Sequence, residues 1–205
     1  LAQQGFAVVN PTYRLAPEYR FPAAMEDLNA VFAFVMQHAA EYGLDTTNLF
    51  GIGDSAGATG MAAYAALLAD SEYAANYPFT PPAGLKLRAI ALNCGTFSMD
   101  DMLEPMRDVL PQTEPEKALH LLDIPKHITA GFPPCYLMTA YGDFNCNQPM
   151  KLFAELKNNN IPYQYKVWGD KNNPLGHVFH CNLHDPAAHD ANKAETDFFH
   201  SHIQN

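Results

Sequence analysis

A serine flanked by glycines is the residue of this sequence best placed to do chemistry. The GDSAG run at 53–57 matches the pattern Gly-x-Ser-x-Gly, in which a sharp turn between a strand and a helix exposes the serine hydroxyl. Residues 49–53 read as a short strand, and residues 58–70 are rich in alanine and leucine, which favour a helix. A serine before a helix can also be a simple N-cap. The strand–turn–helix context favours the other interpretation, and we predict that Ser55 is a nucleophile.

A serine nucleophile needs a base, usually a histidine whose ring is oriented by a carboxylate. With this type of turn the acid and then the base follow the serine along the chain. Asp143 comes directly after the apolar run 134–142, and His177 lies in a loop after the last predicted strand. We therefore predict Asp143 as the acid and His177 as the base. Asp170 is a competing acid, although it lies closer to the loop of the base.

The residues around Ser55 also suggest how a substrate would be held. Because Ser55 precedes a helix, the amide of Ala56 should point at the attacked carbonyl and donate to the developing oxyanion. Further substrate contacts are expected from four side chains: Asp54, Phe97, Met99 and Met102.

A metal site is the main alternative for the histidine-rich end of the chain. On a helix, the spacing of four residues would form one face able to bind zinc: His177, His180, Cys181 and His184. The segment has no regular helical onset, and His177 already fits the role of base. We therefore expect no metal and no cofactor, and His180 is expected to support the site or pack beside it.

Strands and helices alternate along the sequence. Apolar or strand-forming runs predict strands at 6–13, 49–53, 85–94, 134–142 and 163–169. Helical patterns occur at 23–41, 58–70, 148–158 and 186–203. This alternation predicts an α/β fold, with a mostly parallel sheet covered by helices on both faces.

The stretch 95–131 has several prolines, mixed charge and no strand pattern. It is too long for an ordinary connection, so we predict a lid or cap insertion over Ser55. Its wall residues would be Phe97, Met99, Met102 and Leu103.

Composition limits the classes of protein. The chain has 205 residues, 48% of them hydrophobic, which suits one domain with its own core. Twelve Lys and Arg against 22 Asp and Glu give a net charge of -10, which disfavours nucleic acid as a partner. Four dispersed cysteines do not suggest a disulfide framework. The N-terminus lacks a basic segment followed by an apolar run, as a secretory signal would have, and no apolar run is long enough for a membrane span. The expected location is cytoplasmic, and the sequence is compatible with a homodimer.

Three motifs together resemble the hormone-sensitive-lipase group of α/β-hydrolases: YRLAPE at 13–18, FPAAMED at 21–27 and GDSAG at 53–57. Members are mostly microbial carboxylesterases acting on short acyl chains, and the resemblance runs from residue 5 to the terminal helix. It implies an α/β-hydrolase fold, an ester as small-molecule substrate and a Ser55–Asp143–His177 triad. It also implies that Arg14 and Asp27 pair to brace the loop beneath the site.

The sequence departs from that group in two places. Phe144-Asn145 follows the predicted acid where a Pro-Leu pair is common, and the HGGG-type oxyanion loop is absent. Residues 1–5 read as the last turn of a helix capped by Gly5. We therefore expect one hydrolase domain over 1–205, with its N-terminal strands and oxyanion loop missing. In the group's sheet another strand lies between the segments matching 6–13 and 49–53, so these should run roughly 9.5 Å apart.

Two other functions remain open at this point. An amidase or peptidase could use the same triad, because these residues do not distinguish an ester from an amide. A non-catalytic relative could serve as a binding module, although the complete triad favours an enzyme.

Overall fold

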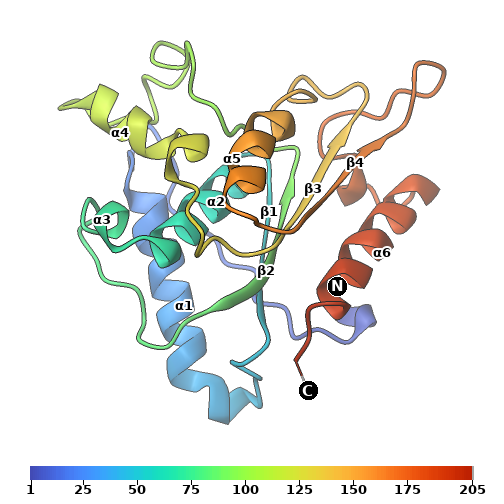
Figure 1. Cartoon of the computed structure of the whole chain (residues 1–205), viewed down its shortest axis with the longest axis horizontal. Coiled ribbons are helices and arrows are strands. Elements are labelled where there is room, and N and C mark those ends of the chain that lie inside the picture. Colours follow the sequence, from blue (N-terminus) through green and yellow to red (C-terminus); the bar gives the residue numbers. More distant parts are fainter. Residues whose placement is uncertain (205) are drawn as a thin grey trace.

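Four parallel strands form the centre of the molecule, in the order β1-β2-β3-β4 (Figure 1). The computed structural model describes residues 1–204. The strands are β1 (Leu49–Asp54), β2 (Leu87–Asn93), β3 (Cys135–Ala140) and β4 (Tyr163–Trp168). Because all four run the same way, their carboxyl ends share one edge of the sheet, where parallel sheets gather ligand-binding residues.

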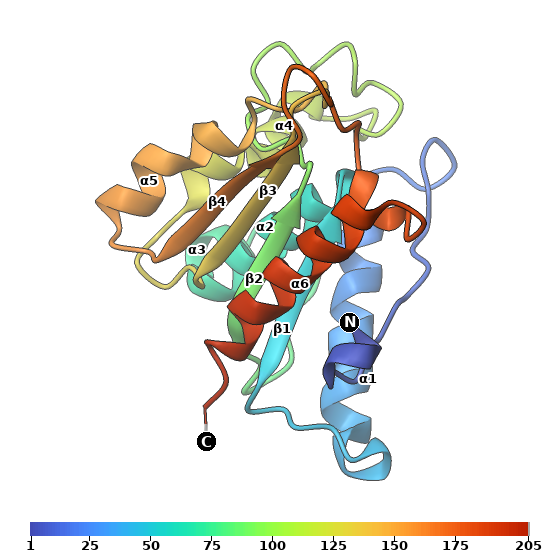
Figure 2. The ribbon, with the colours of Figure 1, turned by 90° about the vertical axis from the view of Figure 1, so that its right-hand side faces the viewer.

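Helices cover both faces of this sheet. One face packs against α1 (Ala23–Tyr42), α2 (Ala56–Ala69) and α5 (Phe153–Asn158). The other packs against α6 (Pro186–His200), which lies nearest the viewer in Figure 2. The remaining segments are short: α3 (Ser71–Ala74), α4 (Pro115–Leu122), η1 (Ala2–Gln4), η2 (Ile124–His127), η3 (Pro149–Leu152) and η4 (Phe179–Cys181). The predicted α/β class is confirmed.

Strand β2 shows how the sequence builds the two core layers. Successive side chains of a strand point to opposite faces of the sheet. Ile90 and Leu92 pack on the side of α2, whereas Ala89 and Ala91 face α6. The small alanines leave room on that face for aromatic rings, including Phe198 of α6. Among residues 1–204, no helix is both long enough and apolar enough to cross a membrane.

The predicted strand at 6–13 is wrong. This segment is extended but belongs to no ladder, and within the described residues no backbone bond joins it to β1. Its side chains Val8 and Val9 instead line a cavity whose opposite wall includes Phe50 and Ile52 of β1. Strand-forming residues become a strand only when a neighbour lies about 4.8 Å away, and here the cavity separates the two segments. Gly5 does adopt the predicted left-handed cap, with φ 91°.

Candidate active site

Ser55 occupies a strained turn between β1 and α2. Its φ of 55° and ψ of -120° lie in a region that residues other than glycine seldom adopt. The Ser55 amide donates to the backbone carbonyl of Asn93 at 2.8 Å, which ties the turn to the end of β2. Ala56 is the first residue of α2, so its amide belongs to the N-terminal amides that have no acceptor inside the helix. The turn therefore presents a hydroxyl and a free donor side by side.

The two glycines of the GDSAG motif have different roles. A Cβ atom on Gly53 would lie 2.2 Å from the carbonyl oxygen of Gly57 and 2.6 Å from the amide nitrogen of Ala58. A Cβ atom on Gly57 would meet nothing within 4 Å. Only the first glycine is required by the close approach of β1 and α2.

This difference gives a test of the turn. Gly53→Ala should destabilise the protein by about 1–3 kcal/mol, because backbone atoms must move to admit the methyl group. Gly57→Ala, the matched control, should be neutral or stabilising by up to about 1 kcal/mol, because alanine favours helices. For a domain of this size, 1 kcal/mol shifts the Tm by about 2–4 °C, which thermal unfolding by circular dichroism resolves. Equal Tm values for the two variants would contradict the proposed close packing at Gly53.

The predicted acid and base come together at Ser55. The Ser55 Oγ lies 2.9 Å from Nε2 of His177, and His177 Nδ1 lies 2.9 Å from Oδ1 of Asp143. An ionised carboxylate can only accept, so Nδ1 of a neutral His177 carries the proton and Nε2 is left as an acceptor for the serine hydroxyl. The three side chains come from the end of β1, the loop after β3 and the loop after β4. This geometry can transfer a proton from Ser55 to His177.

Asp143 is fixed by further hydrogen bonds at the end of β3. It is buried, its Oδ2 accepts from the Thr139 hydroxyl at 3.2 Å, and its Oδ1 accepts from the Asn145 amide at 2.8 Å. Cys94 also lies against it. Burial, followed by a hydrogen bond with Asp143, raises the pKa of the Cys94 thiol to about 12. Cys94 is therefore a neutral neighbour of the acid.

The competing acid Asp170 lies in a turn of its own, and residues 177–184 do not form the helix on which the zinc site depended. Asp170 accepts the amides of Asn172 and Asn173 in its own turn, so it is an exposed turn residue. Residues 177–184 contain only the short η4, because the chain leaves its last strand in turns rather than a helix. His177 therefore contacts Ser55, whereas Nε2 of His180 lies 2.6 Å from Oδ1 of Asp54.

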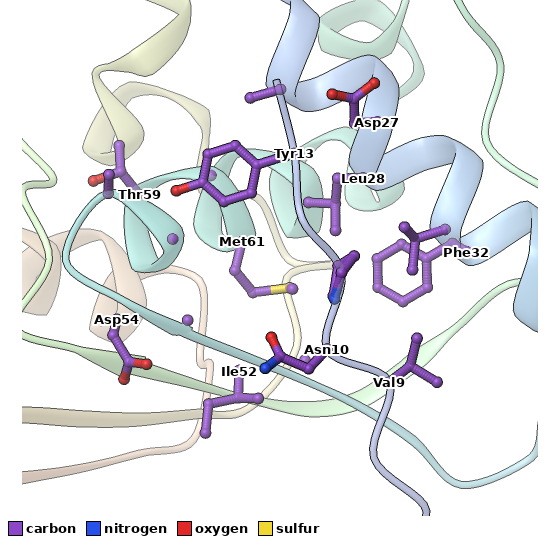
Figure 3. A pocket seen from close by; sticks show the side chains of 18 of the residues that line it. Val9, Asn10, Tyr13, Asp27, Leu28, Phe32, Ile52, Asp54, Thr59 and Met61 are labelled. Atoms are coloured by element: carbon purple, nitrogen blue, oxygen red, sulfur yellow. The ribbon is translucent and has the colours of Figure 1, made fainter. Parts of the chain in front are cut away.

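A large, mostly apolar cavity of about 1180 Å³ opens beside Ser55. It runs from Ser55 and Ala56 to the space between β1 and residues 6–13 (Figure 3). In that view Asn10 points toward Ile52 and Met61 across the gap, whereas Val9 points to the other side, toward Phe32 of α1. The segment 95–131 also contributes to its wall, through Met99, Met102, Met106, Val109 and Leu122.

The structure places two of the predicted wall residues elsewhere. Asp54, Met99 and Met102 line the cavity. Phe97 is fully buried in the core instead, and Leu103 is 40% exposed at the surface. The segment around them is irregular, so no sequence periodicity separates inward from outward positions.

The predicted pairing of Arg14 with Asp27 is confirmed. Arg14 Nε lies 2.8 Å from Oδ1 of Asp27, and the Arg14 backbone amide donates to Oδ2 at 2.7 Å. Glu26 adds a second carboxylate, 2.7 Å from Arg14 Nη2. The pair joins the YRLAPE segment to the first turn of α1, which places Tyr13 on the cavity wall.

Comparisons with known proteins agree with this fold. Residues 1–180 match a protein family described as having the alpha/beta hydrolase fold. An acetyl esterase of Salmonella paratyphi A is 27% identical over 175 residues, covering 80% of this chain and 54% of that protein. "Lipase 2" of a Moraxella species is 43% identical over 56 residues, or 27% of this chain and 13% of that protein.

Solved structures give the same fold. Esterase B from Lactobacillus Rhamnosis superposes with a TM-score of 0.79 at 21% identity, over 92% of this chain and 64% of that one. The same enzyme inhibited by a tributyrin phosphonate gives a TM-score of 0.81 at 18% identity, over 92% and 63%. The chain spans about half the length of the acetyl esterase and less than two thirds of esterase B.

Proposed function

The chain belongs to the α/β-hydrolase fold family, and on that premise we propose that it cleaves carboxylic esters of small molecules through an acyl group held on Ser55. One observation carries the proposal: Ser55, His177 and Asp143 form an unbroken chain of hydrogen bonds, each 2.9 Å long. Structural serines have no need of a histidine that is itself held by a buried carboxylate.

The reaction follows from the roles that these atoms can take. His177 Nε2 accepts the Ser55 proton as Oγ attacks the ester carbonyl, and the Ala56 amide donates to the oxygen that gains charge. His177 then gives the proton to the leaving alcohol, and the acyl group remains on Ser55. A water molecule, deprotonated by the same histidine, then attacks the acyl carbon. The bond to Ser55 Oγ breaks, His177 returns the proton to Oγ, and the acid is released. Asp143 stays ionised and stabilises the imidazolium in both halves.

The relatives support esters over amides as substrates. The similar proteins are named acetyl esterase, lipase and esterase, and one of the structures holds a phosphonate inhibitor. Short acyl chains are therefore our proposal for the acid part of the substrate. We also propose that residues 1–205 act as one hydrolase domain, in which 95–131 is the lid over the site.

Two assays test the function directly. A fluorophosphonate probe should label the protein, because only an activated serine reacts with it. The p-nitrophenyl esters of short acids should be hydrolysed, whereas the matching anilides should not be turned over at a comparable rate. A protein that is folded, unlabelled and inactive on every ester would favour the non-catalytic binding module.

The lid has its own test, based on the length of the acyl chain. Met102→Ala should raise the ratio of kcat/KM for a hexanoate ester over an acetate ester by about 10-fold or more. Loss of the Met102 side chain gives room for the longer chain, and each methylene group placed in an apolar pocket is worth about 1–3 kcal/mol. Leu103→Ala is the matched control, since Leu103 is the next residue but lies outside the cavity wall. An unchanged ratio in both variants would argue against 95–131 as a wall of the acyl site.

A further inference from the structure

A chain of polar side chains lies behind the Ser55 turn, at the junction of β1, β2, η4 and α6. Asn93, the last residue of β2, donates through Nδ2 to Oε2 of Glu195 at 2.6 Å and to Oδ1 of Asp54 at 3.2 Å. The same Asp54 oxygen lies 2.6 Å from Nε2 of His180. The backbone carbonyl of Asn93 is the acceptor for the Ser55 amide. One residue, Asn93, therefore links the strained serine to a buried glutamate.

Glu195 is an unusual residue at this position. Its side chain is 0% exposed, on the face of α6 that packs against the sheet. Within residues 1–204, Asn93 is the one donor to its carboxyl group, and Oε1 has no partner. An ionised carboxylate is costly in such a place unless several donors surround it. The site therefore favours a neutral Glu195, which still accepts from Asn93.

The groups around Glu195 act on its protonation in both directions. Burial raises the pKa of Glu195 to about 7, against the lowering effects of the Asn93 hydrogen bond and of His180. Asp54 raises the pKa of Glu195 further, and the amino group of Leu1 lowers it. Tyr136 of β3 and Cys181 of η4 are further titratable neighbours. Burial raises the pKa of each, and Glu195 adds a smaller contribution in the same direction.

We propose that Asn93 and Glu195 are positioning residues for Ser55, and that a neutral Glu195 keeps the turn in its reactive geometry. When Glu195 ionises, Asn93 lies between two carboxylates, and a second negative charge faces the turn. That charge opposes the negative charge that develops on the substrate oxygen at Ala56. The part of this inference that concerns activity rests on the proposed ester hydrolysis, whereas the link from Glu195 to the turn does not.

The link can be measured without any turnover. In the wild-type protein the amide chemical shifts of Ser55 and Ala56 should change with pH, with a midpoint near the Glu195 pKa of about 7. An infrared titration of the wild-type protein should show the loss of a protonated buried carboxyl group over the same range. Glu195→Gln keeps the shape and the acceptor but cannot ionise, so the infrared change should vanish. The amide change should vanish as well when both proteins carry His177→Ala, which removes the imidazole that contacts Ser55. Thr196→Val is the matched control, because Thr196 is equally buried on α6 and bonds only to carbonyls of its own helix.

The stability and the activity of the protein should both depend on the protonation of Glu195. Since the folded-state pKa of Glu195 is raised from 4.5 to about 7, its stabilising contribution is present below about pH 4.5 and is lost as the pH rises through 7. The Tm of Glu195→Gln relative to wild type should therefore rise between about pH 5 and about pH 8. The kcat/KM of the wild type should fall as the pH rises above the Glu195 pKa of about 7, whereas the kcat/KM of Glu195→Gln should not.

The outcomes separate the two proposals. The positioning role would be overturned if the Ser55 and Ala56 amide shifts of the wild type did not change as the Glu195 carboxyl group loses its proton. A Glu195 that is ionised throughout the pH range would overturn it as well. Both results hold whether or not the protein hydrolyses esters. Superimposable kcat/KM profiles for the wild type and Glu195→Gln would also overturn it. An inactive, unlabelled wild type whose amide shifts follow Glu195 would refute ester hydrolysis but leave the link from Glu195 to the turn supported.

Discussion

Replacement of Ser55 by alanine is expected to lower the turnover of a p-nitrophenyl ester by about 10⁶-fold and to abolish labelling by a fluorophosphonate. The change removes the Oγ atom that lies 2.9 Å from His177 Nε2. The fold should survive, because the Ser55 side chain makes no capping hydrogen bond to α2 and the strained backbone is held through the Asn93 carbonyl. Hydrolysis rates and circular dichroism of the purified variant measure both effects.

Two comparisons make this result specific to Ser55. Ser201→Ala should keep full activity, because the Ser201 hydroxyl donates to Phe198 at the far end of α6. His177→Ala should cost about as much as Ser55→Ala, and the double variant should cost no more than either, because residues of one catalytic unit are not additive. Turnover near that of the wild type in Ser55→Ala, freed of contaminating esterase, would remove Ser55 from the mechanism.

The geometry of the turn could be predicted from sequence because its requirements are local. A strand, a small residue, a serine and a helix follow one another within a few positions, and Gly53 has no room for a side chain. The chain order of acid and base, which is information about the fold class rather than about this sequence, predicted Asp143 and His177, and the structure brings both into contact with Ser55 or with each other. Arg14 and Asp27 were found in the same way, through the motifs that hold them.

The environment of each strand could not be predicted in this way. Residues 6–13 have the composition of a strand, but composition does not say whether a partner lies beside it. The exposed apolar side chains Val8 and Val9 face a cavity rather than a neighbouring strand. Phe97 was misplaced for a related reason, since an irregular segment gives no period from which to assign a face.

The polar chain behind Ser55 was missed, although the sequence contains a signal for it. In the last helix, Ala188, Ala191, Glu195 and Phe198 recur at helical spacing and all are buried. A glutamate on the apolar face of a helix needs a partner in the core, and this anomaly could have marked Glu195. Its partner, Asn93, ends a strand two positions before Gly95 and has no motif of its own.

Asp143→Asn should lower turnover by about 10⁴-fold while leaving the site assembled. An asparagine of the same shape can offer an amide hydrogen where the carboxylate accepted, and His177 then carries its proton on Nε2. That tautomer cannot accept the Ser55 proton. An amide nitrogen at the position of Oδ1 loses the hydrogen bond from the Asn145 amide. The oxygen at the position of Oδ2 still accepts from Thr139 and holds the side chain near the orientation of the native carboxylate.

Asp170→Asn is the matched control for this prediction, because the two aspartates stand at the ends of adjacent parallel strands. Asp170 accepts two amides in its own turn, and an asparagine carbonyl oxygen can accept them as well. Activity should therefore stay within a few-fold of wild type, with at most a small loss of Tm. The kcat at saturating ester separates the two variants, since a change of tautomer lowers kcat without weakening substrate binding. If Asp170→Asn lost most of its activity while Asp143→Asn stayed fully active, the acid would be Asp170. The 2.9 Å contact between His177 and Asp143 would then have no part in catalysis.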